Sequence, residues 1–175
     1  MASGQLQIVE LGRLSMRDWA QLVEGEHEPF GGTCAGFEFH AKDHHIGIRD
    51  AEGALIAAGG WSRLEVDVEG HGRFEVIGVG ALIVRHDRRG SGLATPIMQR
   101  IRERTAQTGI ALRLLLCEPH LVELYARWDY HLIEDPVWVQ QPSGPVRWPL
   151  CAMWRAAEPS ATWPAGVVRI QGRPF

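Results

Sequence analysis

The chain has 175 residues, 45% of them hydrophobic and 22% charged, a composition that excludes a disordered polypeptide and predicts one globular domain. Its net charge of −3 argues against a dedicated nucleic-acid binder. No apolar run reaches the ~18 residues of a membrane span, and Met-Ala-Ser-Gly-Gln at the start does not resemble an export signal. The three cysteines, Cys34, Cys117 and Cys151, have no metal-type spacing. We therefore expect a reduced, cytoplasmic protein without a metal site or a membrane partner.

The first 43 residues predict a strand, a helix and a loop. Residues 5–11 alternate between apolar and polar side chains, as a half-buried strand does. Ser15 is placed to cap a helix over residues 16–24. Residues 25–43 are rich in Gly, His and acidic side chains and predict a loop.

Residues 44–84 predict a β-meander. A strand containing Ile46 and Ile48 is followed by a turn at residues 50–53 and a long strand over residues 54–67. Glu69-Gly-His-Gly72 predicts a hairpin turn, after which residues 73–84 form the returning strand. Glycines inside a strand often mark a bulge or a close backbone approach, and we expect Gly78 and Gly80 to do so here.

From residue 93 onward the apolar period changes from two to 3.6 residues, which predicts a helix. One face of that helix carries Ala94, Ile97, Met98, Ile101 and Thr105. A central strand over residues 112–117 and a second helix from Pro119 follow. Strand-like stretches at residues 131–139 and 146–155 precede a proline-containing tail. This order excludes a β-sandwich and a helix bundle, and it predicts an α/β (α+β) sheet with helices on both faces.

The segment Arg89-Gly-Ser-Gly92-Leu-Ala94 joins a strand to a helix. The first-turn N–H groups of a helix and its dipole together attract anions, and glycines let the backbone approach a phosphate closely. The segment lacks the lysine of a P-loop and the third glycine of a dinucleotide fingerprint. Taken alone, it fits either an anion-binding site or a plain glycine turn.

The pattern R-x-x-G-x-A in this segment resembles motif A of the GNAT superfamily, the acetyl-CoA-dependent N-acetyltransferases. Downstream, Glu118-Pro-His-Leu-Val-Glu-Leu-Tyr125-Ala-Arg-Trp-Asp-Tyr130 is similar to motif B of that family. Leu124-Tyr125 matches motif B, and Tyr130 stands for its Phe. Three other positions depart from it: Glu118 replaces Asn, Leu121 replaces Ala and Asp129 replaces Gly.

The resemblance implies a GNAT fold, with a mixed, mostly antiparallel sheet split by a bulge. It implies a GNAT domain over residues 1–157 and a C-terminal extension over residues 158–175. Within the superfamily, three features resemble the aminoglycoside 2′-N-acetyltransferases: the element lengths from Gly36 to Gly90, the turn from Val84 to Gly90 and the stretch from Leu124 to Trp148. The implied co-substrate is acetyl-CoA, bound by Leu82, Ile83, Val84, Arg89, Gly90, Ser91, Gly92, Leu93, Ala94, Thr95 and Glu118.

The resemblance also makes Tyr125 the candidate general acid, since a protonated phenol can give its proton to the departing thiolate. The alternative is a core tyrosine. The base is less well defined: many relatives carry a Glu where this chain has Gly80, and we take Glu75 as the nearest carboxylate on the same strand. His71, His120, Glu118 and a chain of waters remain alternatives.

Two further features bear on the acceptor. Acidic residues and aromatic rings gather in the first 43 positions, which suits either a wall for a cationic amine or a solvated surface; they are Asp18, Glu24, Glu26, Glu28, Glu38 and Asp43, with Trp19 and Phe30. Cys117 ends the central strand, where a small core thiol is favoured over an acyl-carrying nucleophile.

The sequence therefore predicts acetyl transfer from acetyl-CoA to a primary amine of a small cationic acceptor, by direct attack in a ternary complex. Two alternatives stay open: a GNAT fold that senses acyl-CoA without turnover, and a protein N-acetyltransferase. The expected partners are a small-molecule amine and, as an option, a second copy of the chain, with no nucleic acid.

Overall fold

The computed structural model describes residues 6–26 and 30–175 and divides into two compact units. Unit 1 takes in Met1–Phe30, Lys42–Trp61 and Gly80–Gln107, and unit 2 takes in Gly31–Ala41, Ser62–Val79 and Thr108–Phe175. Two long strands, β3 (Leu55–Val68) and β4 (Gly72–Val84), contribute residues to both units. They match the two long strands of the predicted meander within one or two residues.

In unit 1, β1 (Gln7–Leu11) pairs antiparallel with β2 (His44–Arg49), and β2 pairs antiparallel with the first half of β3. The predicted strand at residues 5–11 is confirmed from Gln7 to Leu11, and Leu6 precedes it. The first residue of the prediction, Gln5, lies outside the described residues.

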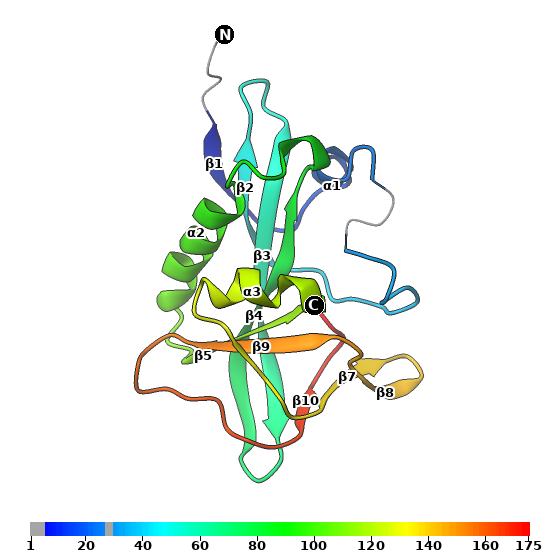
Figure 1. Ribbon diagram of the computed structural model, residues 1–175, viewed down its shortest axis with the longest axis vertical. Helices are drawn as coiled ribbons and strands as arrows, with labels where there is room; N and C mark the ends of the chain where they lie inside the picture. Colours follow the sequence, from blue (N-terminus) through cyan, green and yellow to red (C-terminus); the bar gives the residue numbers. More distant parts are fainter. Residues whose placement is uncertain (1–5, 27–29) are drawn as a thin grey trace. The chain divides into compact units, whose positions relative to one another are not determined.

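Two helices belong to unit 1, α1 (Met16–Leu22) and α2 (Ala94–Ala106). Leu22 of α1 packs in a buried cluster with Ala58 of β3. On the next residue, Gly59, an added Cβ would lie 2.8 Å from Ile97 of α2. Because neighbouring residues of a strand face opposite sides, α1 and α2 cover opposite faces of the unit 1 strands (Figure 1). The expected helices on both faces are confirmed.

Helix α1 begins with a capping box. The Asp18 amide donates to the Ser15 hydroxyl oxygen over 3.1 Å, and the Ser15 hydroxyl donates to the Asp18 carboxylate over 2.7 Å. Asp18 also accepts from Arg49 of β2 at 2.8 Å. The predicted cap at Ser15 is confirmed, and the ion pair fixes the helix to the sheet.

Unit 2 is built around β5 (Leu112–Cys117), whose bounds match the predicted central strand. It pairs in parallel with Ile77–Val79 of β4 and antiparallel with β9 (Cys151–Ala156), which also pairs with β6 (His131–Leu132). Parallel and antiparallel pairs thus meet in one mixed sheet, as predicted.

The rest of unit 2 is formed by β10 (Val168–Ile170), which pairs antiparallel with β3 and parallel with β7 (Val137–Gln141). β7 continues into β8 (Gly144–Arg147). Each strand-like stretch expected at residues 131–139 and 146–155 is in fact two strands. Pro136 and Pro149 lie in the gaps, where proline cannot donate to a ladder.

The C-terminal residues 158–175, set apart by sequence as an extension, contribute to unit 2. Besides β10, Phe175 is buried in a hydrophobic cluster of unit 2 with Val68, Leu114 and Val139. The Pro174 carbonyl accepts from the His40 amide at 2.7 Å. The boundary between a domain and an extension at residue 157 stays a prediction.

The helix predicted from Pro119 is a 3-10 turn, η2 (Pro119–Leu121), followed by the short helix α3 (Val122–Ala126). A second 3-10 turn, η1 (His86–Arg88), follows β4. Within the described ranges, no helix has both the length and the apolar character needed to cross a membrane.

Gly78 of β4 marks a close approach of neighbouring side chains, and the unusual backbone conformation of the strand lies at Ala81. A Cβ on Gly78 would lie 2.3 Å from Leu64 and 2.9 Å from Phe175, so Gly78 permits a close approach. The left-handed residue in β4 is Ala81, with φ of 51°. A left-handed alanine costs about 1–2 kcal/mol relative to the ordinary region, so surrounding structure holds β4 in an irregular conformation there.

Candidate functional site

The turn between β4 and α2 is open on its outer side. Gly90 and Gly92 have φ of 76° and 79°, and a Cβ added to either would meet nothing within 4 Å. Leu93, the N-cap residue of α2, provides no side-chain cap for the helix. The Thr95 amide donates to the Gly92 carbonyl oxygen at 3.3 Å. A thirteen-residue helix with an uncapped first turn and two left-handed glycines before it is suited to receive an anion.

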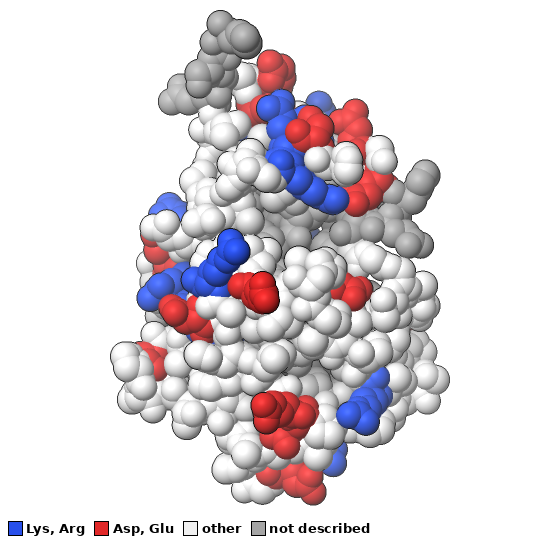
Figure 2. Space-filling model, in the orientation of Figure 1, with Lys and Arg blue, Asp and Glu red and all other residues white. Residues whose placement is uncertain are grey.

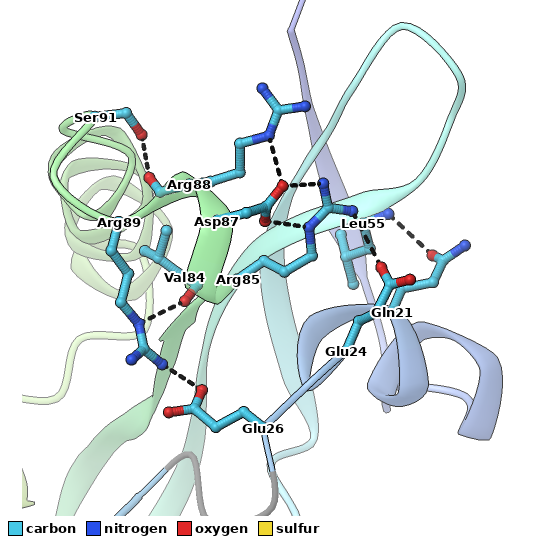
Figure 3. Close-up of polar contacts among 10 residues, drawn as sticks. All are labelled: Gln21, Glu24, Glu26, Leu55, Val84, Arg85, Asp87, Arg88, Arg89 and Ser91. Carbon is cyan, nitrogen blue, oxygen red and sulfur yellow. Dashed lines mark hydrogen bonds and ion pairs between the residues drawn. The ribbon is translucent and has the colours of Figure 1, made fainter.

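The Arg89 side chain extends from this turn toward Val84 and Glu26 (Figure 3). Its Nε donates to the Val84 carbonyl oxygen at 3.1 Å, and its Nη2 contacts the Glu26 carboxylate. The Ser91 hydroxyl donates to the Arg88 carbonyl oxygen. The guanidinium predicted to meet a phosphate is thus held by a carboxylate in this structure.

The neighbouring arginines are partly neutralised as well. Arg85 makes a two-pronged contact with Asp87, at 2.6 and 2.9 Å, and lies 3.7 Å from Glu24. The Arg85 hydrogen bonds lower the pKa of the Asp87 carboxyl. Arg88 lies 3.5 Å from the same carboxylate and is about half exposed. All three arginines near the turn thus have a carboxylate partner, and Arg88 and Arg89 are the two that remain about half exposed to an incoming anion.

The acidic side chains of the first 43 residues are paired with arginines. Figure 2 shows the same mixing of basic and acidic side chains on one face of the molecule. The pairs are Asp18–Arg49, Glu24–Arg85, Glu26–Arg89, Glu38–Arg173 and Asp43–Arg13. Glu28 lies outside the described residues. Of the expected aromatic rings, Trp19 and Phe30 lie 5.9 Å apart in unit 1.

Leu82–Val84, the segment predicted to meet the pantetheine arm, ends β4 directly after the left-handed Ala81. The Ile83 side chain is buried in the unit 1 cluster, whereas Leu82 and Val84 are half-buried. The buried Ile83 anchors the segment, and the Val84 carbonyl faces the Arg89 guanidinium described above.

Tyr125 lies on α3 in unit 2 and is 7% exposed. Its ring makes edge contacts with Trp128 and Tyr130, at centroid distances of 5.9 and 6.2 Å. Burial, followed by the nearby Cys117 thiol, raises the pKa of its phenol well above the ordinary value. The proton therefore stays on Tyr125 throughout the physiological range.

Cys117 shows how these surroundings treat a thiol. Burial raises its pKa to about 12, with smaller contributions from Cys151 and Glu118. Cys151 is its partner directly across the β5–β9 ladder. The three cysteines, all within the described residues, are free thiols. A thiol with so high a pKa is a poor nucleophile, which favours a core role for Cys117.

The departures from motif B are accommodated locally. Asp129, which stands for Gly, has φ of 63°, and Asp tolerates this left-handed conformation better than most residues. The amides of Trp128 and Tyr130 both donate to the Tyr125 carbonyl oxygen. The chain thus closes α3 as a glycine would and places Tyr130 in the core.

The candidate bases are less well placed. Glu75 is exposed on β4 in unit 2. It lies five residues before Gly80, so in a regular strand the two face opposite sides, and only a bulge between them would bring Glu75 to the face of Gly80. The left-handed Ala81 comes after Gly80 and therefore does not do so. His71 and His120 are exposed. Glu118 is half-buried, and its Oε1 lies 2.9 Å from where a Cβ on Gly31 would be. Glu75 as the base stays a prediction.

Among the residues that the structure describes, no three His, Cys, Asp or Glu side chains gather to hold a metal ion. The sequence missed the long-range ion pairs at the candidate site, Arg85–Glu24 and Arg89–Glu26. In the second pair, Nη2 of Arg89 contacts the Glu26 carboxylate. These partners lie 63 residues apart, and the one local signal was that Glu26 belongs to the acidic N-terminal segment.

The model of the acetyltransferase (GNAT) domain family matches residues 25–133. The chain therefore belongs to the GNAT acetyltransferase family, and its mixed sheet with helices is the fold of that family. The family supports acetyl-CoA-dependent acyl transfer as the general activity. No sequence among the curated proteins matches this chain.

Solved structures agree on the fold. The GNAT N-acetyltransferase YhbS of Escherichia coli, solved in complex with CoA, has 18% identity and a TM-score of 0.62, over 98% of this chain and 93% of that one. ElaA of Escherichia coli has 15% identity and a TM-score of 0.56, over 86% and 99%. A GNAT acetyltransferase of Staphylococcus aureus has 8% identity and a TM-score of 0.54, over 88% and 100%.

Proposed function

We propose that this protein transfers the acetyl group of acetyl-CoA to a primary amine of a small cationic acceptor. The open turn of unit 1 carries the proposal. It combines two left-handed glycines without neighbours on their outer side, an uncapped helix and the exposed Arg88 and Arg89. These groups fit a pyrophosphate, since they offer backbone N–H donors, a helix dipole and two cations.

The turn residues Arg89 to Thr95 would hold the pyrophosphate of acetyl-CoA, and the Leu82–Val84 backbone would hold its pantetheine arm. Bound acetyl-CoA supplies an activated thioester for attack by the amine. The family membership and the structural likeness to a GNAT protein solved with CoA support this assignment. Glu118, at the Asn position of motif B, is included on the resemblance alone.

Tyr125 keeps its proposed role as the proton donor to the departing thiolate. A thiolate whose conjugate acid has the ordinary pKa of about 8.5 would be too weak a base to deprotonate a buried phenol. However, burial raises the pKa of the Cys117 thiol, which interacts with Tyr125, to about 12. A thiolate generated in similar surroundings would gain basicity in the same way, which brings donor and acceptor closer in proton affinity.

The cationic character of the acceptor is inferred from the acidic and aromatic residues of the first 43 positions, whose carboxylates have arginine partners in the structure and so already accept cationic groups. The aminoglycoside-type acceptor suggested by the sequence resemblance is one member of this class. A cytoplasmic location and an optional homodimer belong to the same proposal. The alternative is an acyl-CoA sensor without turnover. Gly80 stands where many relatives carry a Glu base, and a protein that only binds acyl-CoA needs no base.

The test measures binding and turnover separately. Calorimetry with acetyl-CoA should show one site per chain. A thiol-release assay with spermidine, tryptamine, an aminoglycoside and a lysine-containing peptide should then show release of free CoA dependent on the amine. Binding without thiol release would identify a sensor, and turnover confined to the peptide would identify a protein N-acetyltransferase. Absence of binding at millimolar acetyl-CoA would overturn the proposal.

A further inference from the structure

We infer that Cys151 and Cys117 form a redox-sensitive site, in which hydrogen peroxide converts two thiols of adjacent strands to a disulfide that slows turnover. Formation of the bond is independent of the proposed function, whereas its effect on turnover rests on that function. The inference follows from the positions of the two residues at one end of a strand pair in unit 2.

The β5–β9 ladder places the two cysteines opposite each other. Cys117 is the last residue of β5, Cys151 is the first residue of β9, and the two are direct partners in the antiparallel register. Directly opposed residues of an antiparallel pair share a face, with Cα atoms about 4.5–5.5 Å apart. Disulfides join Cα atoms about 4.4–6.8 Å apart, so the ladder holds the thiols at a separation that the bond can span.

The two thiols differ in their access to solvent. Cys151 is half-buried and follows a loop, whereas Cys117 is only 6% exposed. A peroxide in solution therefore reaches Cys151 first. The Cys151 carbonyl oxygen accepts from the Trp148 indole at 3.2 Å, which holds the start of β9 in place. Cys117 is then the buried thiol positioned to complete the bond.

The reaction takes two steps and releases two waters. In the first step, the Cys151 sulfur attacks one peroxide oxygen and the O–O bond breaks, which leaves a sulfenic acid on Cys151 and, with the thiol proton, one water. In the second step, the Cys117 sulfur attacks the Cys151 sulfur and the S–O bond breaks. The departing hydroxyl takes the Cys117 proton and leaves as the second water. Two electrons have then passed from the pair of thiols to the peroxide.

The ladder affects both the rate of bond formation and the stability of the bond. Burial raises the pKa of Cys117 to about 12, which slows its attack, but its fixed place opposite Cys151 makes the second step intramolecular. Opposed Cβ atoms lie about 4.5–5.5 Å apart, about 1 Å further than in a relaxed disulfide. The bond must therefore draw the strand ends together, and a strained disulfide is readily reduced by small thiols.

Oxidation would affect the candidate acid through the same strand end. The Cys117 thiol interacts with the Tyr125 phenol. From Cys117 the chain runs through Glu118 and η2 into α3, which carries Tyr125. Because the bond draws the end of β5 toward β9, it should displace Tyr125 from the departing thiolate. A displacement of about 1 Å can cost about 10²-fold in rate, so we expect kcat to fall about tenfold or more.

The first test maps the bond in the wild-type protein. After treatment with hydrogen peroxide and removal of the excess, peptide mapping without reductant should find Cys117 joined to Cys151. Reduced glutathione should restore both thiols. Cys34→Ser is the matched control, because it removes the third, half-buried cysteine of unit 2 and leaves the opposed pair intact. It should form the same bond, whereas Cys151→Ser should leave Cys117 as a free thiol.

The second test compares kcat of the reduced and the oxidised protein, with the amine of the test panel that gives the highest turnover. Oxidised wild type and oxidised Cys34→Ser should both show kcat about tenfold lower or less, and glutathione should restore it. Cys151→Ser should keep its kcat through the same treatment, which separates the disulfide from other oxidative damage. Its Tm, measured alongside, shows that the variant is folded.

Three results would overturn the inference: an unlinked pair after peroxide treatment, a bond from either residue to Cys34 instead, or an unchanged kcat in protein that carries the mapped bond. Reduced wild-type protein that releases no CoA with any amine would instead overturn the proposed function. The mapped peptides would still decide in that case whether the bond forms.

Discussion

Gly92→Asp tests the anion-binding turn directly. Gly92 has φ of 79°, and a Cβ there meets nothing within 4 Å, so the substitution adds backbone strain without a clash. That strain is about 1–2 kcal/mol. For a chain of this size it corresponds to a fall in Tm of about 2–8 °C. The new carboxylate at the first turn of α2 interacts favourably with the helix dipole, which offsets part of the loss.

The effect on acetyl-CoA should be much larger. A carboxylate about 5 Å from a phosphate repels it by roughly 3 kcal/mol at an effective dielectric constant of 20, and solvent screening reduces this figure. We expect acetyl-CoA affinity to fall by about 10²-fold, measured by calorimetry. Ser91→Ala removes only the hydroxyl contact with the Arg88 carbonyl and should have a smaller effect.

Gly70→Asp is the matched control. Gly70 lies in the β3–β4 hairpin with φ of 81°, and a Cβ there also meets nothing within 4 Å. It introduces the same charge and similar strain away from the turn, so it should lower Tm without changing acetyl-CoA affinity. Wild-type affinity in Gly92→Asp, or an equal loss in Ser91→Ala, would contradict a backbone site for the pyrophosphate.

Two other predictions concern catalysis and stability. Tyr125→Phe should lower kcat by about 10²-fold and leave the KM for acetyl-CoA unchanged, because the phenol acts on the leaving group; an unchanged kcat would make Tyr125 a core residue. Ser15→Ala should cost about 1 kcal/mol by thermal unfolding at pH 7. Hydrogen bonds from Ser15 and Arg49 lower the pKa of Asp18 from its ordinary 3.8, so the stability Asp18 provides is complete above about pH 4 and lost as pH falls through its lower folded pKa. The cost of Ser15→Ala should therefore shrink in acid, and an equal cost at pH 2 and pH 7 would contradict this reading.

The local elements of this fold could be predicted because their signals lie in neighbouring residues. The capping box at Ser15, the hairpin at residues 69–72 and the helix face from Ile97 to Thr105 each depend on a few adjacent side chains. The strand–turn–helix that carries the candidate site is of this kind, since left-handed backbone at Gly90 and Gly92 is favourable only for glycine.

Other features depend on partners far away in the chain. Gly78 was expected to mark a bulge or a close approach; Leu64 and Phe175 approach it closely, and the left-handed residue of the strand is Ala81. The C-terminal strand β10 is only three residues long and forms because β3 and β7 present free ladder positions to it. No periodicity is visible in so short a segment.

The sequence by itself determined the family, the order of the elements as far as β5 and the turn where an anion can bind, because motif residues and periodicity are local properties. Only the tertiary structure decided what the charged residues do. Glu26 and Arg89 lie 63 residues apart and come together because α1 and the end of β4 belong to one packed unit. Long charged side chains carry no periodic signal of their partners, so their pairing follows from packing and not from sequence pattern.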